Sequence, residues 1–103
     1  MIYVFDLDGT LCETPPYDGV SQYPNAVPNM ERIAKVNALH DEGHQIWIDT
    51  ARGCTSGRNW LAFTAKQLQD WGVKYHKLRT GVKWGGDVYV DDRSVRPEEF
   101  FGG

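Results

Sequence analysis

Three short apolar segments, rich in β-branched and aromatic residues, limit the fold more than any other feature of this sequence. They comprise residues 2–5, 46–48 and 88–90, and each ends abruptly at polar side chains. Continuous apolar strands of this kind are typical of parallel sheets that are buried by helices. A fourth, weaker strand is predicted at residues 74–78. We therefore expect a parallel sheet at the centre of the molecule.

Segments with a helical spacing of apolar residues lie between these strands. We predict one helix between Asn29 and Gly43, a second over about residues 59–71, and a short helical turn that begins at Pro97. The alternation of strands and helices predicts a single α/β domain over residues 1–103. Its expected architecture is a minimal Rossmann-like parallel sheet with right-handed crossovers and with helices on both faces.

Residues 11–27 fit no helix, because three prolines and a glycine interrupt the segment. We expect this segment to form a turn and a flap that folds over the carboxyl ends of the strands. The chain is too short for a large inserted cap domain, so the flap is the one cover that the sequence offers for a site at that edge.

The composition is that of an ordinary globular domain, since 41% of the 103 residues are hydrophobic and 24% are charged. No apolar run approaches the ~18 residues that span a bilayer, and Met1 leads directly into the first strand without a basic leader. Cys12 and Cys54 fit neither a disulfide framework nor a metal knuckle, so a cytoplasmic location is expected. The net charge of -3 disfavours a general nucleic-acid binder.

The carboxyl ends of parallel strands lie at the same edge of a sheet, so the polar residues that follow them are expected to form one site. This site would contain Asp6, Asp8, Thr50, Asp91 and Asp92. Four carboxylates in one place repel one another, and a divalent cation removes that penalty. An oxygen-rich ligand set favours Mg²⁺, and Mg²⁺ with carboxylates and a lysine suits a phosphoryl group.

The stretch Asp-Leu-Asp-Gly-Thr-Leu at residues 6–11, directly after the first strand, resembles motif I of the haloacid dehalogenase-like (HAD) superfamily. Thr50 is similar to motif II of that superfamily, Lys83 to motif III, and Asp91 with Asp92 to motif IV. The resemblance extends from Met1 to about Phe101. Residues 50–53, 71–76 and 89–92 also resemble small capless phosphatases associated with capsular polysaccharide biosynthesis.

The resemblance implies a magnesium-dependent phosphatase that acts through an aspartyl-phosphate. Asp6 would be the nucleophile and Asp8 the general acid and base. The implied metal ligands are the Asp6 carboxylate, the Asp8 backbone carbonyl, Asp91, and Asp92 through water. The residues implied in binding the phosphate or the rest of the substrate are Leu7, Asp8, Thr50, Ala51 and Arg52. Lys83 would offset the carboxylates and orient Asp6, with Lys77 as the alternative lysine.

The implied substrate is a phosphorylated sugar or a similar metabolite or glycan, with no membrane partner. An uncapped site is open, so either a bulky substrate or a neighbouring subunit of a homo-oligomer would cover it. A second interpretation is a nucleotide or nucleic-acid 3′-phosphatase, in which Arg52 and Arg58 bind the phosphate backbone. A third is a non-enzymatic receiver-like module that binds phosphate. The sequence leaves open whether Asp49 faces this site and whether Asp8-Gly9 is only a hairpin turn.

Overall fold

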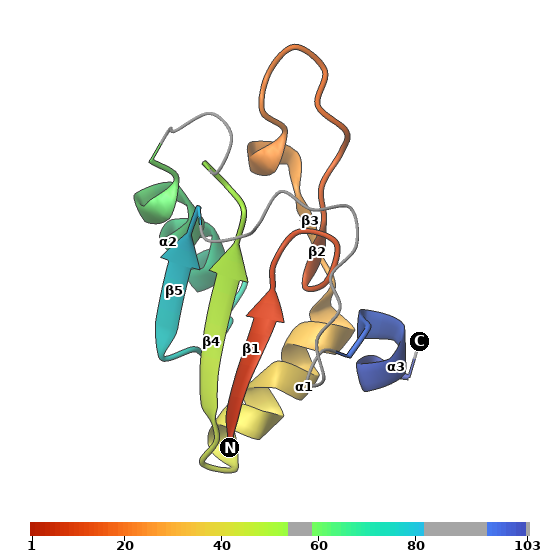
Figure 1. Cartoon of the computed structure of the whole chain (residues 1–103), viewed down its shortest axis with the longest axis vertical. Helices are drawn as coiled ribbons and strands as arrows, with labels where there is room; N and C mark the ends of the chain where they lie inside the picture. Colours follow the sequence, from red (N-terminus) through yellow and green to blue (C-terminus); the bar gives the residue numbers. More distant parts are fainter. Residues whose placement is uncertain (54–58, 82–94, 103) are drawn as a thin grey trace.

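A central three-stranded sheet organises the chain in the computed structural model, which describes residues 1–53, 59–81 and 95–102. The strands β1 (Ile2–Asp6), β4 (Gln45–Thr50) and β5 (Lys77–Thr80) are parallel and lie in the order β1-β4-β5 (Figure 1). The parallel pairing of the first two predicted strands is confirmed. The predicted strand at 88–90 lies outside the described residues.

The weaker strand starts later than the predicted range of 74–78. The first residues of that range instead belong to the connection from the preceding helix. There the backbone N–H of Lys74 donates to the side-chain oxygen of Asn37 at 2.8 Å. The N–H of His76 then donates to the carbonyl of Ile46 at 2.7 Å and aligns the chain with β4. Regular pairing therefore begins only at Lys77.

The three helices lie close to their predicted positions. They are α1 (Met30–Asp41), α2 (Leu61–Asp70) and α3 (Pro97–Phe101). Asn29 caps α1, since its side chain accepts a hydrogen bond from the N–H of Arg32 at 3.1 Å. Helix α2 starts two residues later than predicted, because the side chain of Asn59 accepts from the N–H of Leu61.

Helices α1, α2 and α3 share one apolar core with a single face of the sheet. That core contains Phe5, Leu7, Leu11, Cys12, Ile33, Val36, Ile46, Ile48, Leu68, Val73 and Phe101. Alternate side chains of β1, including Ile2 and Val4, are exposed on the other face. The expectation of helices on both faces is thus wrong for the described residues. Both crossovers step the same way across the sheet, and right-handed crossovers then place their helices on the same side (Figure 1).

The flap extends beyond the carboxyl ends of the strands (Figure 1). Its base is more regular than predicted: β2 (Cys12–Glu13) pairs antiparallel with β3 (Val27–Pro28), and Tyr23–Asn25 form one 3-10 turn, η1. Two short paired strands fix both ends of the loop, while the prolines exclude an α-helix between them. Within the described ranges, no helix combines the length and the apolar character that a membrane crossing requires.

Substituting the cap of α1, in Asn29→Ala, is expected to lower the free energy of unfolding by about 0.5–2 kcal/mol. The reason is that the N–H of Arg32 loses its side-chain acceptor. Urea unfolding monitored by circular dichroism measures the loss. Asn29→Asp keeps an oxygen at the same place and is expected to stay near the original stability. Equal losses in the two variants would contradict the capping role.

Candidate active site

A tight turn after β1 places two carboxylates at the carboxyl edge of the sheet. The carbonyl of Leu7 accepts hydrogen bonds from the N–H groups of Thr10 at 3.1 Å and Leu11 at 2.9 Å, and Leu7 itself is fully buried. Gly9 has a φ of 85°, in the left-handed region that favours glycine. The turn does not join a hairpin, since β1 pairs with β4 and β2 pairs with β3. Asp6 and Asp8 therefore flank the buried Leu7.

Side chains from the end of β4 and from the flap hold the Asp8 carboxylate. Arg52 donates to both of its oxygens, from Nε to Oδ2 at 2.9 Å and from Nη2 to Oδ1 at 2.8 Å. The hydroxyl of Thr14, in the flap, donates to Oδ1 at 2.6 Å. Thr50, the last residue of β4, donates from Oγ1 to Oδ2 at 3.3 Å. The structure thus brings together three of the predicted site residues, Asp8, Thr50 and Arg52.

Arg52 lies behind Asp8 and not on the surface, with 1% of the residue exposed. Its Nη1 donates to Thr64 Oγ1 at 3.2 Å and to Gln67 Oε1 at 2.8 Å, and its guanidinium carbon lies 4.6 Å from the ring centre of Tyr23. This placement differs from the expectation that Arg52 grips the substrate. The sequence did contain a signal: Arg52 continues the period of two that places Ile48 and Thr50 on the buried side of β4.

The surroundings of Asp8 favour its charged form. Burial opposes ionisation, but the hydrogen bonds from Arg52 and Thr14, together with the Arg52 charge, outweigh it and lower the pKa of Asp8 below its usual value. Burial and the nearby Asp8 charge raise the pKa of Cys12 to about 12. The Cys12 thiol is therefore protonated at neutral pH and is a poor nucleophile and a poor metal ligand.

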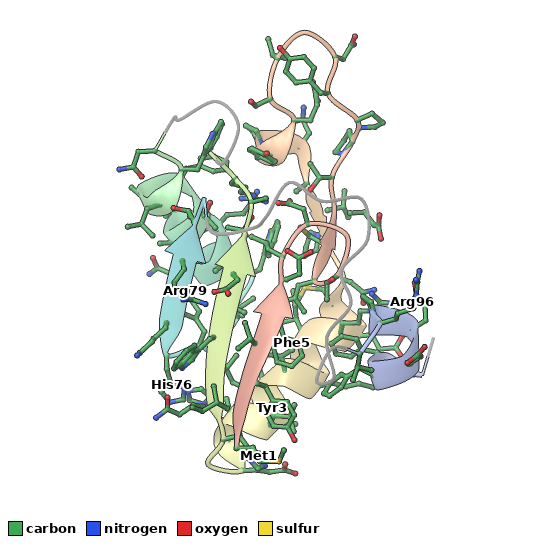
Figure 2. The ribbon with its side chains drawn as sticks, in the orientation of Figure 1. Met1, Tyr3, Phe5, His76, Arg79 and Arg96 are labelled. Atoms are coloured by element: carbon green, nitrogen blue, oxygen red, sulfur yellow. The ribbon has the colours of Figure 1, made fainter. Side chains whose placement is uncertain are left out.

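Asp6 ends β1 opposite Asp49 in the strand register. Its Oδ1 accepts from the N–H of Leu7 at 3.0 Å. Asp49, whose orientation the sequence left open, forms a two-pronged ion pair with Arg79 of β5, with distances of 2.8 and 2.6 Å. Figure 2 labels Arg79 on this strand. The Asp49 charge is therefore balanced locally.

The oxygen donors of Asp6 and Asp8 fit a hard cation such as Mg²⁺, while the thiol of Cys12, which contacts Asp8, stays protonated. The part of the chain that the structure describes holds no group of three metal-ligating side chains. The other expected ligands, Asp91 and Asp92, lie outside the described residues, and so does the expected lysine, Lys83. Two of the four expected ligand residues, Asp6 and Asp8, are therefore among the described residues.

The other predicted site residues make no described contact with the group around Asp8. Lys77, the alternative lysine, is the first residue of β5, and its Nζ lies 4.4 Å from the ring centre of Trp47, away from the carboxyl edge. Ala51 follows Thr50 and is exposed. Arg58 lies outside the described residues. His40 and His76 stack with their ring centres 4.7 Å apart.

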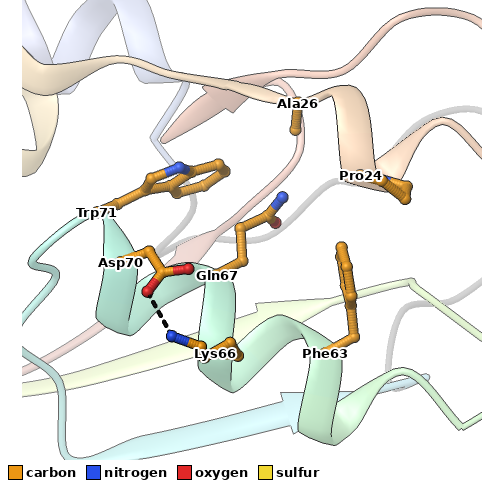
Figure 3. Close-up of a pocket in the computed structure, with 7 residues that line it drawn as sticks. All are labelled: Pro24, Ala26, Phe63, Lys66, Gln67, Asp70 and Trp71. Carbon is orange, nitrogen blue, oxygen red and sulfur yellow. Dashed lines mark hydrogen bonds and ion pairs between the residues drawn. The ribbon is translucent and has the colours of Figure 1, made fainter.

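A shallow hollow of about 260 Å³ separates the base of the flap from α2 (Figure 3). It is lined by Pro24, Ala26, Phe63, Lys66, Gln67, Asp70 and Trp71. None of these is a predicted site residue, and Lys66 and Asp70 pair with each other at 2.8 Å. The hollow is therefore separate from the group around Asp8, although Gln67 contacts both.

Comparison with known proteins identifies a relative but no activity. No protein-family model matches the chain, and no curated protein matches it. It is similar to a crystal structure of a target protein from Vibrio cholerae, with 31% sequence identity and a TM-score of 0.82. The match covers 99% of this chain and 88% of the other, whose description names no function. The chain therefore belongs to the same family as this Vibrio cholerae protein.

Proposed function

We propose that this protein is a magnesium-dependent phosphomonoester hydrolase of the HAD type, acting through an aspartyl-phosphate. The observation that carries the proposal is the arrangement at the carboxyl edge of the sheet. Asp6 ends β1, and Asp8, two residues later, is held by Thr50 from the end of the neighbouring strand. This agrees with the motif order that the sequence resembles, on the parallel sheet that the motifs require.

In the first step, an Asp6 oxygen attacks phosphorus as the bond between phosphorus and the ester oxygen breaks. The departing oxygen takes a proton from the Asp8 carboxyl group, and the alcohol leaves. In the second step, water attacks the phosphorus of the aspartyl-phosphate and gives its proton to the Asp8 carboxylate. Inorganic phosphate leaves, and the Asp6 carboxylate is restored. The proton count of Asp8 is the same after each full cycle.

The state of Asp8 in the free protein matches the second of these steps. Its lowered pKa favours the carboxylate, which is the base that receives the proton from water. The first step needs the acid form. The part of the phosphoryl charge that Mg²⁺ does not neutralise would oppose the effect of Arg52, because like charges raise the pKa of a carboxyl group. That remaining charge would favour the protonated form for the first step.

When bound, Mg²⁺ would neutralise charge on the phosphoryl oxygens and help to align them. Asp6 and the backbone carbonyl of Asp8 would hold it, together with Asp91 and Asp92. Thr50 and the backbone of Ala51 would bind the phosphoryl oxygens. The exposed flap leaves room for a bulky substrate, and a phosphorylated sugar remains our proposal for its class.

The alternatives have less support. The nucleic-acid interpretation relied on Arg52 and Arg58 to bind a phosphate backbone. The Arg52 guanidinium is buried against Asp8, and Arg58 lies outside the described residues. The receiver interpretation needs no acid or base beside the phosphorylated aspartate. In this protein a buried arginine, two threonines and a turn all hold the second carboxylate. Contacts that fix the Asp8 carboxylate in this way are expected in an enzyme that uses this group as an acid and base.

The test is a screen of phosphorylated sugars, other phosphorylated metabolites, 4-nitrophenyl phosphate and 3′-phosphorylated oligonucleotides, with Mg²⁺ and with EDTA. We expect release of inorganic phosphate that requires Mg²⁺ and is greatest with sugar phosphates. A preference for oligonucleotides that falls steeply with salt would favour the nucleic-acid interpretation. Stoichiometric phosphorylation of the protein without turnover would favour the receiver interpretation.

A further inference from the structure

We propose that Arg52 is a positioning residue, which holds the Asp8 carboxylate in line for proton transfer and fixes it to the base of the flap. The inference rests on the proposed function and deepens it. Arg52 would not touch the substrate or the reacting atoms. Its effect on the reaction would pass entirely through Asp8.

The geometry of the ion pair supports orientation as well as charge compensation. Two nitrogens of Arg52 reach two different oxygens of Asp8, at 2.9 and 2.8 Å. A two-pronged contact of this kind fixes the plane of the carboxylate, which a single ammonium group cannot do. The direction of the Asp8 oxygens is therefore set by the guanidinium plane.

The guanidinium plane is itself fixed from behind. Nη1 of Arg52 donates to Thr64 and Gln67, one helical turn apart on α2, and one ring face of Tyr23 lies against the guanidinium. The side chain of Gln67 also donates from Nε2 to the carbonyl of Tyr23 at 2.9 Å. Tyr23 begins η1 at the base of the flap. Arg52 therefore links Asp8 to both helix α2 and the flap.

The experiment compares two substrates that differ in their need for an acid. The leaving group of 4-nitrophenyl phosphate is stable as an anion, whereas the alkoxide of glycerol phosphate needs a proton as it leaves. If Arg52 orients Asp8, Arg52→Lys should lower kcat/KM, which reports the first step, at least about tenfold more for glycerol phosphate than for 4-nitrophenyl phosphate. KM for both substrates should change less than about threefold, because no binding group is lost.

Gln67→Met provides a second variant in case Arg52→Lys does not fold. It removes one anchor of the guanidinium without touching Asp8, so a smaller change in the same direction is expected, about threefold between the two substrates. Lys66→Gln is the matched control. It changes the neighbouring residue of α2, which is exposed and pairs only with Asp70 among the described residues, and it should leave both substrates unaffected.

Three outcomes decide the matter. A selective loss of glycerol phosphate turnover in the foldable variants supports the proposal. Equal losses of kcat/KM with both substrates, or a rise in KM as the main effect, would overturn it while leaving the phosphatase function intact. Hydrolysis of neither substrate by the unmodified protein, across the full phosphate screen, would instead overturn the proposed function, and the role of Arg52 with it.

Discussion

Asp6→Asn is expected to abolish the hydrolysis of phosphomonoesters, with kcat falling by at least about 10³-fold. An amide is a much weaker nucleophile than a carboxylate, so no aspartyl-phosphate can form at this position. Initial rates of phosphate release measure the loss. Acid quenching after brief exposure to labelled substrate is expected to trap phosphoprotein in the unmodified chain and none in the variant.

Asp49→Asn is the matched control for this experiment. Asp49 stands opposite Asp6 in the register of the neighbouring strand, and its carboxylate pairs with Arg79. The same chemical change one strand away should leave kcat within about threefold of the original value. Unfolding curves of both variants show whether the fold is kept. A folded Asp6→Asn variant with normal activity would remove Asp6 from its role as nucleophile.

The strands and helices could be predicted because their signals are local. An apolar run followed by a polar residue marks the end of β1 and of β4, and Asn29 and Gly43 bracket α1. The face on which the helices lie could not be predicted, because it depends on the order of the strands in the sheet. That order is set by pairings between distant segments, which no local pattern contains.

In the candidate site, too, the local motifs could be predicted from the sequence and the contacts between distant segments could not. Asp6 and Asp8 follow β1 in a recognisable motif, and Thr50 ends the next strand, so their common location at one edge follows from parallel pairing alone. The period of two along β4 indicates that Arg52 is buried, but it does not indicate which groups surround the guanidinium. An arginine in a loop after a strand is normally exposed. Here Thr64 and Gln67 arrive from α2, and together with Asp8 they satisfy the hydrogen-bond donors of a fully buried guanidinium.

The ion pair between the half-buried Asp8 and the buried Arg52 also affects stability. Removing only the carboxylate, in Asp8→Ala, is expected to lower the free energy of unfolding by about 3–5 kcal/mol, since it leaves a buried guanidinium without its counter-ion. This is a large part of the stability of a typical small domain, about 5–15 kcal/mol. Urea unfolding measures this loss of free energy, provided that the dependence on urea concentration (the m value) is the same in both proteins.

The double variant Asp8→Ala, Arg52→Met separates the ion pair from simple loss of packing. It removes both charges and fills part of the space of the arginine with an apolar chain, so it is expected to be more stable than Asp8→Ala alone. Both variants should be inactive with alkyl phosphates. A loss below about 1 kcal/mol in Asp8→Ala, as in an exposed ion pair, would contradict the burial of Arg52.

The same pair predicts how stability changes with acid. Because the pKa of Asp8 is lower in the folded protein than the ordinary value of about 3.9, the pair stabilises the fold fully above that value. The stabilisation is lost as pH falls further, through the lower pKa of the folded state, where protonated Asp8 leaves Arg52 unpaired. Asp8→Ala lacks this contribution, so the stability difference between the two proteins should shrink as pH falls below about 4. A constant difference down to pH 2 would mean that Arg52 does not stabilise the Asp8 carboxylate.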